Sequence, residues 1–388
     1  MGLSIGTALL DSRPELRVVV IDKEDALGMH ASGRNSGVLH AGFYYSPDSL
    51  KARFCREGNV ELKALCEQYE IPVLSCGKVV VTQNDDEEER LDTLFQRGIA
   101  NGVSLELLEA SQLSRVEPLA RTHERFMWSP NTAISDSHAV IQAMANKFIS
   151  RGGKIVLDKK IEISSRNGEV FDGTQNFTFS YLVNSAGAQA DRLASLAGIK
   201  HDYAMVPFMG VYRSVSNTKL PLQTLVYPVP HKVNPFLGVH FTLTLDGKVK
   251  IGPTAIPILG REQYSLTHGW SISDMKEAVK GALALIRGET HDFSRIAMQE
   301  LPKLSQRRLI LEAQRLVPMA GQVRGWSKKP PGIRAQLVHI PTGRLEQDFV
   351  VQNHLNSTHI LNAVSPGWTS SIPFGRYVAQ EKVLPNLG

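Results

Sequence analysis

Apolar runs and amphipathic segments alternate along the first half of the chain, which predicts strands interleaved with helices. Residues 16–21 (LRVVVI) form a continuous β-branched run, typical of a strand buried on both faces of a parallel sheet. Apolar and small residues at helical spacing precede it over 3–12. Amphipathic helices are expected over 48–70, 85–100 and 136–150. The alternation favours an α/β fold.

The middle of the chain has a different pattern. Residues 203–265 are rich in β-formers, and Asp246-Gly247 between two alternating runs predicts an antiparallel hairpin. Asn167-Gly168 predicts a second hairpin turn by the same reasoning. After Pro331 the chain returns to short strands and a final helix opened by residues 365–371. We therefore expect a second domain laid on the first.

A long helical segment is predicted over residues 272–316. We interpret its apolar face as packed on the core, with a helix lying on a membrane surface as the alternative. The residues on that face are Met275, Val279, Leu283 and Leu285.

Composition narrows the class of protein. The 388 residues are 42% hydrophobic and 21% charged, and the formal charge of +5 is spread without a basic block, which argues against nucleic acid and favours anionic ligands. No apolar run reaches the ~18 residues of a membrane span. The cysteines, Cys55, Cys66 and Cys76, lack CxxC spacing, so neither a disulfide framework nor a metal site is expected, and a reducing compartment is favoured.

Two glycine-rich turns are candidates for cofactor binding. The loop SGRNSGVLHAGFYY follows the first strand, and its serines and backbone N–H groups are suited to hydrogen-bond a pyrophosphate. A surface loop rich in turn formers is the alternative. Asp22 ends that strand, where dinucleotide folds place an acid that binds ribose hydroxyls. The strand YLVN runs into Ser185-Ala186-Gly187, a second site of close backbone approach.

The chain opens part-way through a dinucleotide-binding fingerprint. That fingerprint needs strand, GxGxxG, helix, strand and acid, whereas this sequence opens at Met1-Gly2, in the position of the last glycine. Two explanations are open: a start codon assigned too far downstream, or a real truncation.

These landmarks resemble the glycine/D-amino-acid-oxidase-like family of FAD-dependent oxidoreductases and, within it, the group that oxidises L-2-hydroxyglutarate. The pieces that carry the resemblance are VVVIDKED, SGRNSGVLHAGFYY, LKARFCREG, LVNSAGAQAD, TLVYPVP, PFLGVHFTLTLDGKVKIGPTA, GREQY, QRLVP and GIRAQ. It implies an α/β fold with a Rossmann-like FAD-binding domain lacking its first strand, and an antiparallel-sheet substrate domain. The expected domains are 1–75, 137–202 and 332–388 for FAD, and 76–136 and 203–331 for the substrate.

The resemblance also assigns roles to residues. Asp22 stands where these enzymes usually have Glu, and His40 lies where relatives place a residue near the isoalloxazine. The implied cofactor-binding residues are Gly2, Asp22, Lys23, Ser32, Gly33, Arg34, Asn35, Ser36, Gly37, Ile161, Ala186, Gly187, Gly332, Ser365 and Gly367.

Catalysis is assigned to His40, His240 and Arg334. An imidazole suits removal of the hydroxyl proton, and a guanidinium suits a carboxylate. His40 has an alternative role in supporting its loop, and His240 is a competing base. Tyr44, Tyr45 and Tyr227 are candidate substrate-binding hydroxyls. The run Met209-Gly210-Val211-Tyr212-Arg213 departs from the RGEYY of the relatives, and Arg213 is a candidate to compensate for the lost arginine.

The implied reaction is oxidation of L-2-hydroxyglutarate to 2-oxoglutarate with FAD, the electrons passing to a quinone-type acceptor or oxygen. The alternatives are another hydroxy acid, a secondary amine, or a non-catalytic flavoprotein remnant. We expect a hydroxy-dicarboxylate substrate, no nucleic acid and no metal. The expected location is cytoplasmic, with peripheral contact with the inner membrane as an alternative, or mitochondrial in a eukaryote.

Overall fold

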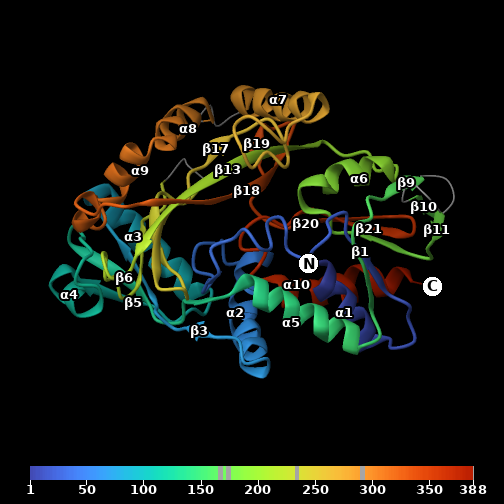
Figure 1. Cartoon of the computed structure of the whole chain (residues 1–388), viewed down its shortest axis with the longest axis horizontal. Helices are drawn as coiled ribbons and strands as arrows, with labels where there is room; N and C mark the ends of the chain where they lie inside the picture. Colours follow the sequence, from blue (N-terminus) through green and yellow to red (C-terminus); the bar gives the residue numbers. More distant parts are fainter. Residues whose placement is uncertain (165–168, 172–175, 232–235, 289–292, 388) are drawn as a thin grey trace.

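The protein consists of two halves that meet along the middle of the molecule (Figure 1). The structure is a computed structural model that describes residues 1–164, 169–171, 176–231, 236–288 and 293–387. One half is a large sheet with helices α3, α4, α8 and α9 around it, and the other holds small sheets with α1, α5, α6 and α10 (Figure 1).

The helices alternate with the strands in the first half of the chain. Three of them follow one another after residue 271, and the last lies near the C-terminus. They are α1 (Gly2–Ser12), α2 (Leu50–Gln68), α3 (Asp85–Ala100), α4 (Leu113–Val116), α5 (Ser137–Ser150), α6 (Ala190–Leu196), α7 (Ile272–Arg287), α8 (Phe293–Glu300), α9 (Gln306–Ala313) and α10 (Ser371–Tyr377).

The strands are mostly short, apart from two long ones that pair with each other. They are β1 (Val19–Ile21), β2 (Val38–Leu39), β3 (Val73–Leu74), β4 (Lys78–Val81), β5 (Glu106–Glu109), β6 (Arg125–Ser129), β7 (Ala133–Ser135), β8 (Lys154–Val156), β9 (Glu162–Ser164), β10 (Glu169–Phe171), β11 (Asn176–Thr178), β12 (Leu182–Asn184), β13 (Tyr203–Ser216), β14 (Leu225–Pro228), β15 (His240–Leu243), β16 (Lys248–Gly252), β17 (Ile256–Pro257), β18 (Ser327–His339), β19 (Arg344–Leu345), β20 (Val350–His354) and β21 (Ser357–Asn362).

The large sheet has the strand order β19-β18-β13-β16-β15-β14-β4-β6-β5, and β17 adds to β13. Its neighbours are antiparallel except β14 and β4, which run parallel. The α/β fold class and the antiparallel second sheet expected from the sequence are confirmed. The predicted Asp246-Gly247 hairpin joins β15 to β16, and Gly247 has the positive φ of 68° that such a turn favours. The predicted turn at Asn167-Gly168 lies outside the described residues, between the antiparallel strands β9 and β10.

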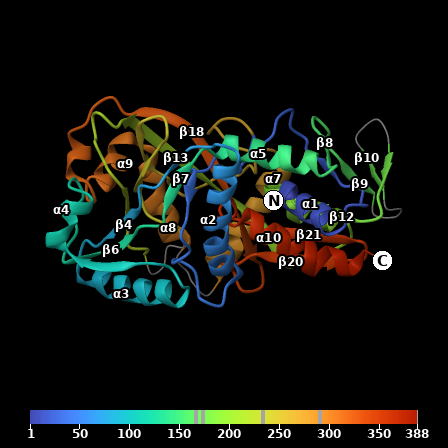
Figure 2. The same cartoon turned by 90° about the horizontal axis from the view of Figure 1, so that it is seen from below.

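Two small sheets in the described part of the chain also contain parallel pairs: β1 with β8, and β12 with β21, to which β20 adds an antiparallel edge. The prediction that residues 16–21 are a strand buried on both faces is wrong. The strand begins only at Val19, which is 48% exposed, because β1 pairs with β8 alone among the described strands. Helix α1 packs against α10 and α5 in this half of the molecule (Figure 2).

Several predicted helices are confirmed together with their caps. The carboxylate of Asp136 accepts hydrogen bonds from the N–H groups of His138 and Ala139 at the start of α5. The Ser49 hydroxyl accepts the N–H of Ala52 at the start of α2. Helix α3 spans the predicted residues 85–100. Such caps satisfy backbone donors that the first helical turn leaves unpaired.

The predicted core-facing side of helix α7 is largely wrong. The residues that pack against the sheet are Ala278, Gly281 and Leu285, because the small Gly281 lets the helix approach Val206 of β13 closely. Of the predicted core face only Leu285 is buried, whereas Val279 and Leu283 are exposed. The predicted helix over 272–316 is also divided into α7, α8 and α9.

The predicted division into domains cuts through a strand. A boundary between residues 331 and 332 falls inside β18, which pairs with β13 along most of its length. Beyond β18, the large sheet continues to Leu345 of β19. The assignment of separate FAD and substrate domains therefore stays a prediction.

Candidate functional site

One face of the large sheet carries a row of polar and aromatic side chains. In the ladder, Leu225 pairs with Lys78, so Tyr227 pairs with Val80 and points to the same side as Lys78. Val226 pairs with Phe241, which places His240 beside Tyr227 on that side. The rings of Tyr227 and His240 stack with their centroids 3.8 Å apart.

The row continues onto β16, because Thr242 pairs with Lys250 and has the same orientation as His240. The ammonium of Lys250 lies 3.4 Å from the carbonyl oxygen of Ser36. The glycine-rich loop that includes Ser36 thus reaches this face of the sheet. We call the side chains of His40, Tyr44, Lys78, Tyr227, His240 and Arg334 the cationic cluster.

His40 is held against the start of the last helical segment. Its N–H donates to the Thr369 hydroxyl over 3.3 Å, and its carbonyl accepts a hydrogen bond from the side chain of Asn59. The Thr369 hydroxyl in turn donates to the carbonyl of Val38. The ring nitrogen Nδ1 of His40 is buried and has no hydrogen-bond partner among the described residues. These contacts fix the backbone and leave the imidazole available to a ligand.

The two histidines differ in their partners. His240 is buried, and its Nδ1 lies 2.8 Å from the carbonyl of Gly238, which requires the proton on Nδ1 and leaves Nε2 as the acceptor. Burial lowers the pKa of His240 to about 3. Burial, with Lys78, His240 and Arg334 nearby, lowers the pKa of His40 well below its ordinary value. Both imidazoles are therefore neutral near pH 7.

Arg334 projects from β18 toward the same cluster. Its guanidinium carbon lies 5.2 Å from the ring centroid of Phe236. Burial lowers the pKa of Arg334, and the hydroxyls of Tyr212 and Tyr45 act on it in the opposite direction. The Tyr45 side chain also shares a hydrogen bond with Ser365. Tyr44 and Tyr227 have pKa values raised by burial, so their hydroxyls stay protonated as possible donors.

Positive charge in the cationic cluster is not balanced by acid. Among the described residues, the groups acting most strongly on the pKa values of Lys78, His40, His240 and Arg334 include no carboxylate. The thiols near Lys78 do not supply the missing charge, because burial raises the pKa of Cys55 to about 12 and of Cys76 to about 11. Buried unpaired cations are costly, so this arrangement suits an anionic ligand.

Lys78 was missed by the sequence analysis, which saw only a strand in GKVVV. Its side chain has no exposure, and its Nζ has no hydrogen-bond partner among the described residues. Lysine is almost never fully buried without a partner. The signal in the sequence that could have identified this residue is a lysine at the start of a buried β-branched run.

The predicted adenosine-binding positions come together where α1 begins. A Cβ on Gly2 would lie 3.0 Å from the hydroxyl of Ser185 and 3.9 Å from Val20, so α1 starts between β1 and the turn after β12. Ala186 and Gly187 are exposed there, and Gly187 has open space around it. The backbone of Asp22 pairs with Val156 and Lys159, which brings the segment before Ile161 beside it.

The loop over residues 32–37 owes its shape to its own contacts. A Cβ on Gly33 would meet the carbonyl of Gly28 at 2.2 Å, and Gly37 has a φ of 74°. The Asn35 side chain accepts the N–H of Gly37 and donates to the carbonyl of Ala31. Asn35 therefore shapes the loop, which leaves Ser32 and backbone N–H groups as the possible phosphate donors.

Three of the predicted cofactor-binding residues, Gly332, Ser365 and Gly367, approach this loop from the C-terminal part of the chain. A Cβ on Gly332 would lie 2.7 Å from the carbonyl of Arg34, so only glycine fits at that crossing. A Cβ on Gly367 would meet the carbonyl of Ala363 at 2.2 Å. Ser365 and Gly367 precede Thr369, the residue that holds His40. The structure thus brings the loop, β18 and the segment 365–369 together beside the cationic cluster.

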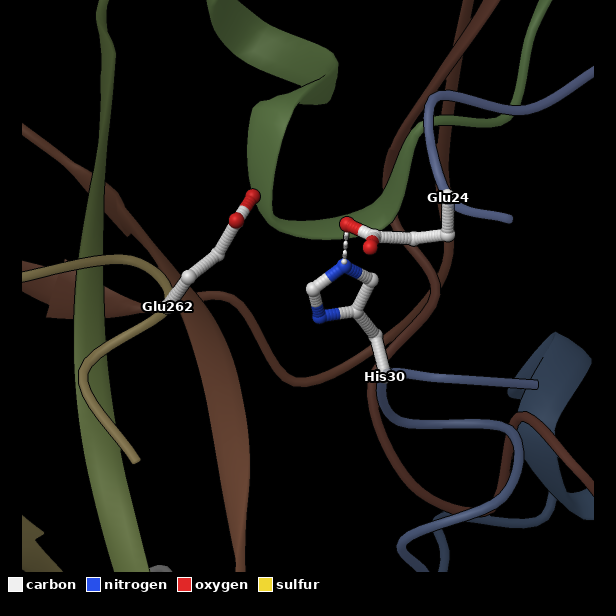
Figure 3. Close-up of side chains that lie close together, drawn as sticks. All are labelled: Glu24, His30 and Glu262. Atoms are coloured by element: carbon white, nitrogen blue, oxygen red, sulfur yellow. Dashed lines mark hydrogen bonds and ion pairs between the residues drawn. The ribbon is translucent and has the colours of Figure 1, made fainter. Parts of the chain in front are cut away.

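A second group of charged side chains lies near the start of this loop (Figure 3). His30 Nε2 lies 2.8 Å from a Glu24 oxygen, and Glu262 faces this pair from the loop after β17. The three could hold a metal ion by geometry. However, the ammonium of Lys23 forms ion pairs with both Glu24 and Glu262. Lys23 therefore occupies the centre of this group and offsets one of its two negative charges, while its predicted cofactor contact stays a prediction.

The fold and these glycine-rich crossings define a flavin-dependent oxidoreductase. The chain belongs to the FAD dependent oxidoreductase (DAO) family, whose model matches residues 1–381. It is 35% identical over 390 residues to an L-2-hydroxyglutarate dehydrogenase of Escherichia coli, covering 98% of this chain and 90% of that protein. It is 32% identical over 406 residues to the mitochondrial L-2-hydroxyglutarate dehydrogenase of Homo sapiens, covering 98% and 86%.

Solved structures share the fold at lower identity. An L-α-glycerophosphate oxidase from Mycoplasma pneumoniae with FAD bound superposes with a TM-score of 0.69 at 22% identity, covering 96% of this chain and 90% of that one. A glycine oxidase from Geobacillus kaustophilus gives a TM-score of 0.70 at 19% identity, covering 97% and 90%.

FAD is the cofactor of this family, and the residues present fit it. Gly187, which has open space where a Cβ would lie, and the loop over residues 32–37 with its Gly37 at a φ of 74° offer backbone that such a cofactor can approach closely. Among the described residues, no helix is both long enough and apolar enough to span a bilayer.

Proposed function

We propose that this protein oxidises L-2-hydroxyglutarate to 2-oxoglutarate with FAD. The observation that carries the proposal is the cationic cluster: Lys78 is fully buried with an unpartnered Nζ, and neither Lys78 nor Arg334 forms an ion pair with a carboxylate among the described residues. It is supported by 32–35% identity to curated L-2-hydroxyglutarate dehydrogenases over nearly the whole chain. An acidic substrate supplies the charge that the cluster lacks.

Each residue then has a defined task in the proposed reaction. The Arg334 guanidinium binds the carboxylate next to the hydroxyl-bearing carbon. His40 accepts the hydroxyl proton at its unpartnered Nδ1 as the carbonyl forms. Tyr44 and Tyr227 are donors for substrate oxygens. FAD, when bound, accepts the hydride that leaves C2. The substrate thereby loses two electrons and two protons, which balances its conversion to the oxo acid.

Anaerobic mixing tests the proposal directly. The FAD-loaded protein should lose the visible absorption of oxidised flavin when L-2-hydroxyglutarate is added, and 2-oxoglutarate should form in an amount equal to the flavin reduced. The D-enantiomer should leave the spectrum unchanged, because a site that holds its carboxylate and hydroxyl as in the L-acid would no longer present the C2 hydrogen in the same direction.

A panel of other substrates separates the alternatives. Bleaching by a secondary amine or another hydroxy acid, with none by L-2-hydroxyglutarate, would assign the fold a different substrate. No bleaching by any of them would favour a non-catalytic flavoprotein.

We further propose that the protein acts at a membrane surface and passes its electrons to a quinone-type acceptor, with oxygen as the alternative. Helix α7 supports this proposal. Its apolar residues Ile272, Val279 and Leu283 are exposed, and Trp270 just before the helix is 51% exposed. Exposed basic residues flank this face at helical spacing: Lys276, Lys280 and Arg287. Such a face is suited to an anionic lipid surface.

Vesicle sedimentation tests the contact with lipid. Wild-type protein should sediment with vesicles containing phosphatidylglycerol more than with pure phosphatidylcholine. Replacing Val279 and Leu283 by serine should weaken this binding, because it removes the apolar contact. The matched control is Val60→Ser, which changes an exposed valine of α2. Equal sedimentation of wild type and the α7 variant would contradict the proposal.

A further inference from the structure

Lys78 lies at the base of the cationic cluster, in an unusual environment for a lysine. It is the first residue of β4, between β14 and β6 in the large sheet, and its side chain has no exposure. Its ammonium lies 4.3 Å from the ring centroid of Tyr227, 5.0 Å from that of Tyr44 and 5.1 Å from that of Phe43.

The aromatic rings compensate only part of the cost of this burial. A cation over an aromatic ring gains less free energy than an ammonium loses when it is withdrawn from water. The Nζ has no hydrogen-bond partner among the described residues. Burial lowers the pKa of Lys78 to about 7, so the group is only partly charged at neutral pH, and neither nearby thiol is ionised to hold its proton. A carboxylate beside Nζ would restore the full positive charge. The ammonium can donate three hydrogen bonds, and none of them has an acceptor among the described residues.

The position of Lys78 relative to Arg334 indicates which acceptor. The Lys78 ammonium lies over the Tyr227 ring, which stacks on His240, so Lys78 is near a candidate base. Arg334 contributes to lowering the pKa of both His240 and His40 from the other side of the site. They come from opposite parts of the sheet, since β14, β15, β16 and β13 separate β4 from β18. A ligand with one carboxylate can satisfy one of them. A ligand with a carboxylate at each end can satisfy both.

We propose that Lys78 binds the second carboxylate of the substrate, so that the enzyme selects dicarboxylic over monocarboxylic 2-hydroxy acids. The inference rests on the proposed function, because it takes Arg334 as the site of the first carboxylate. It adds a residue that determines specificity. Lys78 makes its contact at the end of the substrate that does not react, and His40 remains the proton acceptor.

Binding of unreactive acids tests this role without turnover. Glutarate and butyrate differ by one carboxylate, and titration calorimetry on the FAD-loaded protein should show tighter binding of glutarate by about 10- to 100-fold, the range of a charge-assisted hydrogen bond. In Lys78→Met this preference should shrink to within about threefold. The matched control is Lys328→Met, which removes an exposed lysine from β18 of the same sheet and should keep the full preference.

Steady-state kinetics then distinguish two roles for Lys78, binding of the second carboxylate and acceptance of the hydroxyl proton. Lys78→Met should raise KM for L-2-hydroxyglutarate and leave the rate with L-2-hydroxybutyrate within about threefold of wild type. Equal loss of kcat with both substrates would make Lys78 the proton acceptor and overturn the inference. So would a Lys78→Met protein that keeps the preference for glutarate.

Further results distinguish a folding defect from a lost contact, and a wrong proposed function from a wrong role for Lys78. Removing an unpaired buried charge should hold or raise the melting temperature of the ligand-free protein, so loss of the preference in a well-folded variant is not a folding effect. If wild type prefers glutarate through Lys78 but L-2-hydroxyglutarate leaves its flavin oxidised, the proposed function is wrong and Lys78 still binds a second carboxylate. If wild type oxidises L-2-hydroxyglutarate but binds glutarate no better than butyrate, the proposed role of Lys78 is wrong.

Discussion

Replacing His40 by asparagine should slow flavin reduction by L-2-hydroxyglutarate about 10²- to 10⁴-fold, the usual contribution of a positioned general base. The reason is local. Thr369 and Asn59 hold the backbone of His40, and its buried Nδ1 has no other partner in the described structure. Asparagine keeps these backbone contacts and removes the basic nitrogen. Stopped-flow absorbance under anaerobic conditions measures the effect.

The controls for this prediction use other histidines. His268→Asn changes an exposed histidine and should leave the rate of reduction unchanged. His240→Asn should cost less than His40→Asn, because Nδ1 of His240 is committed to Gly238, whereas Nδ1 of His40 has no partner among the described residues. A greater loss in His240→Asn than in His40→Asn would reverse the assignment.

The pH dependence follows from the same group. Burial and the neighbouring cations lower the pKa of His40, so the imidazole is already deprotonated and able to accept a proton across the neutral range. The rate of reduction should therefore fall only as the pH is lowered into the acid range, where His40 becomes protonated.

Arg334→Met should raise KM for every 2-hydroxy acid about 10²- to 10³-fold, because a bidentate contact with a carboxylate is lost inside the protein. The effect should be as large for L-2-hydroxybutyrate as for L-2-hydroxyglutarate, which distinguishes it from Lys78→Met. Arg334→Lys should recover only part of the affinity, since an ammonium cannot form the planar double contact. Steady-state kinetics on the substrate panel measure these differences.

The matched control is Arg308→Met, which removes an exposed arginine of α9 and should leave KM unchanged. A KM for Arg334→Met within about threefold of wild type would show that another group binds the first carboxylate. Arg213 is a poor alternative, because its pairing with Ile251 directs its side chain to the face of the sheet opposite that of Lys250 and His240.

Motifs with strong local signals were predictable from the sequence. Asp136 starts α5 and Gly247 turns between β15 and β16 as expected, because caps and hairpin turns are decided by a few neighbouring residues. Helix α7 was misread because small residues can form its packed side. Gly281 contacts Val206, and the larger Val279 and Leu283 remain exposed.

The sequence by itself determined the order of strands and helices, the glycine-rich loop and the family resemblance, since these depend on residues close together in the chain. The tertiary structure alone decided what surrounds each charge. Lys23 forms an ion pair with Glu262, 239 residues away, which the sequence did not predict. Lys78 is enclosed by Tyr44 and Tyr227 and has no such partner. The cost of burying a charge depends on distant neighbours, so only the folded chain distinguishes a neutralised lysine from one that requires a ligand.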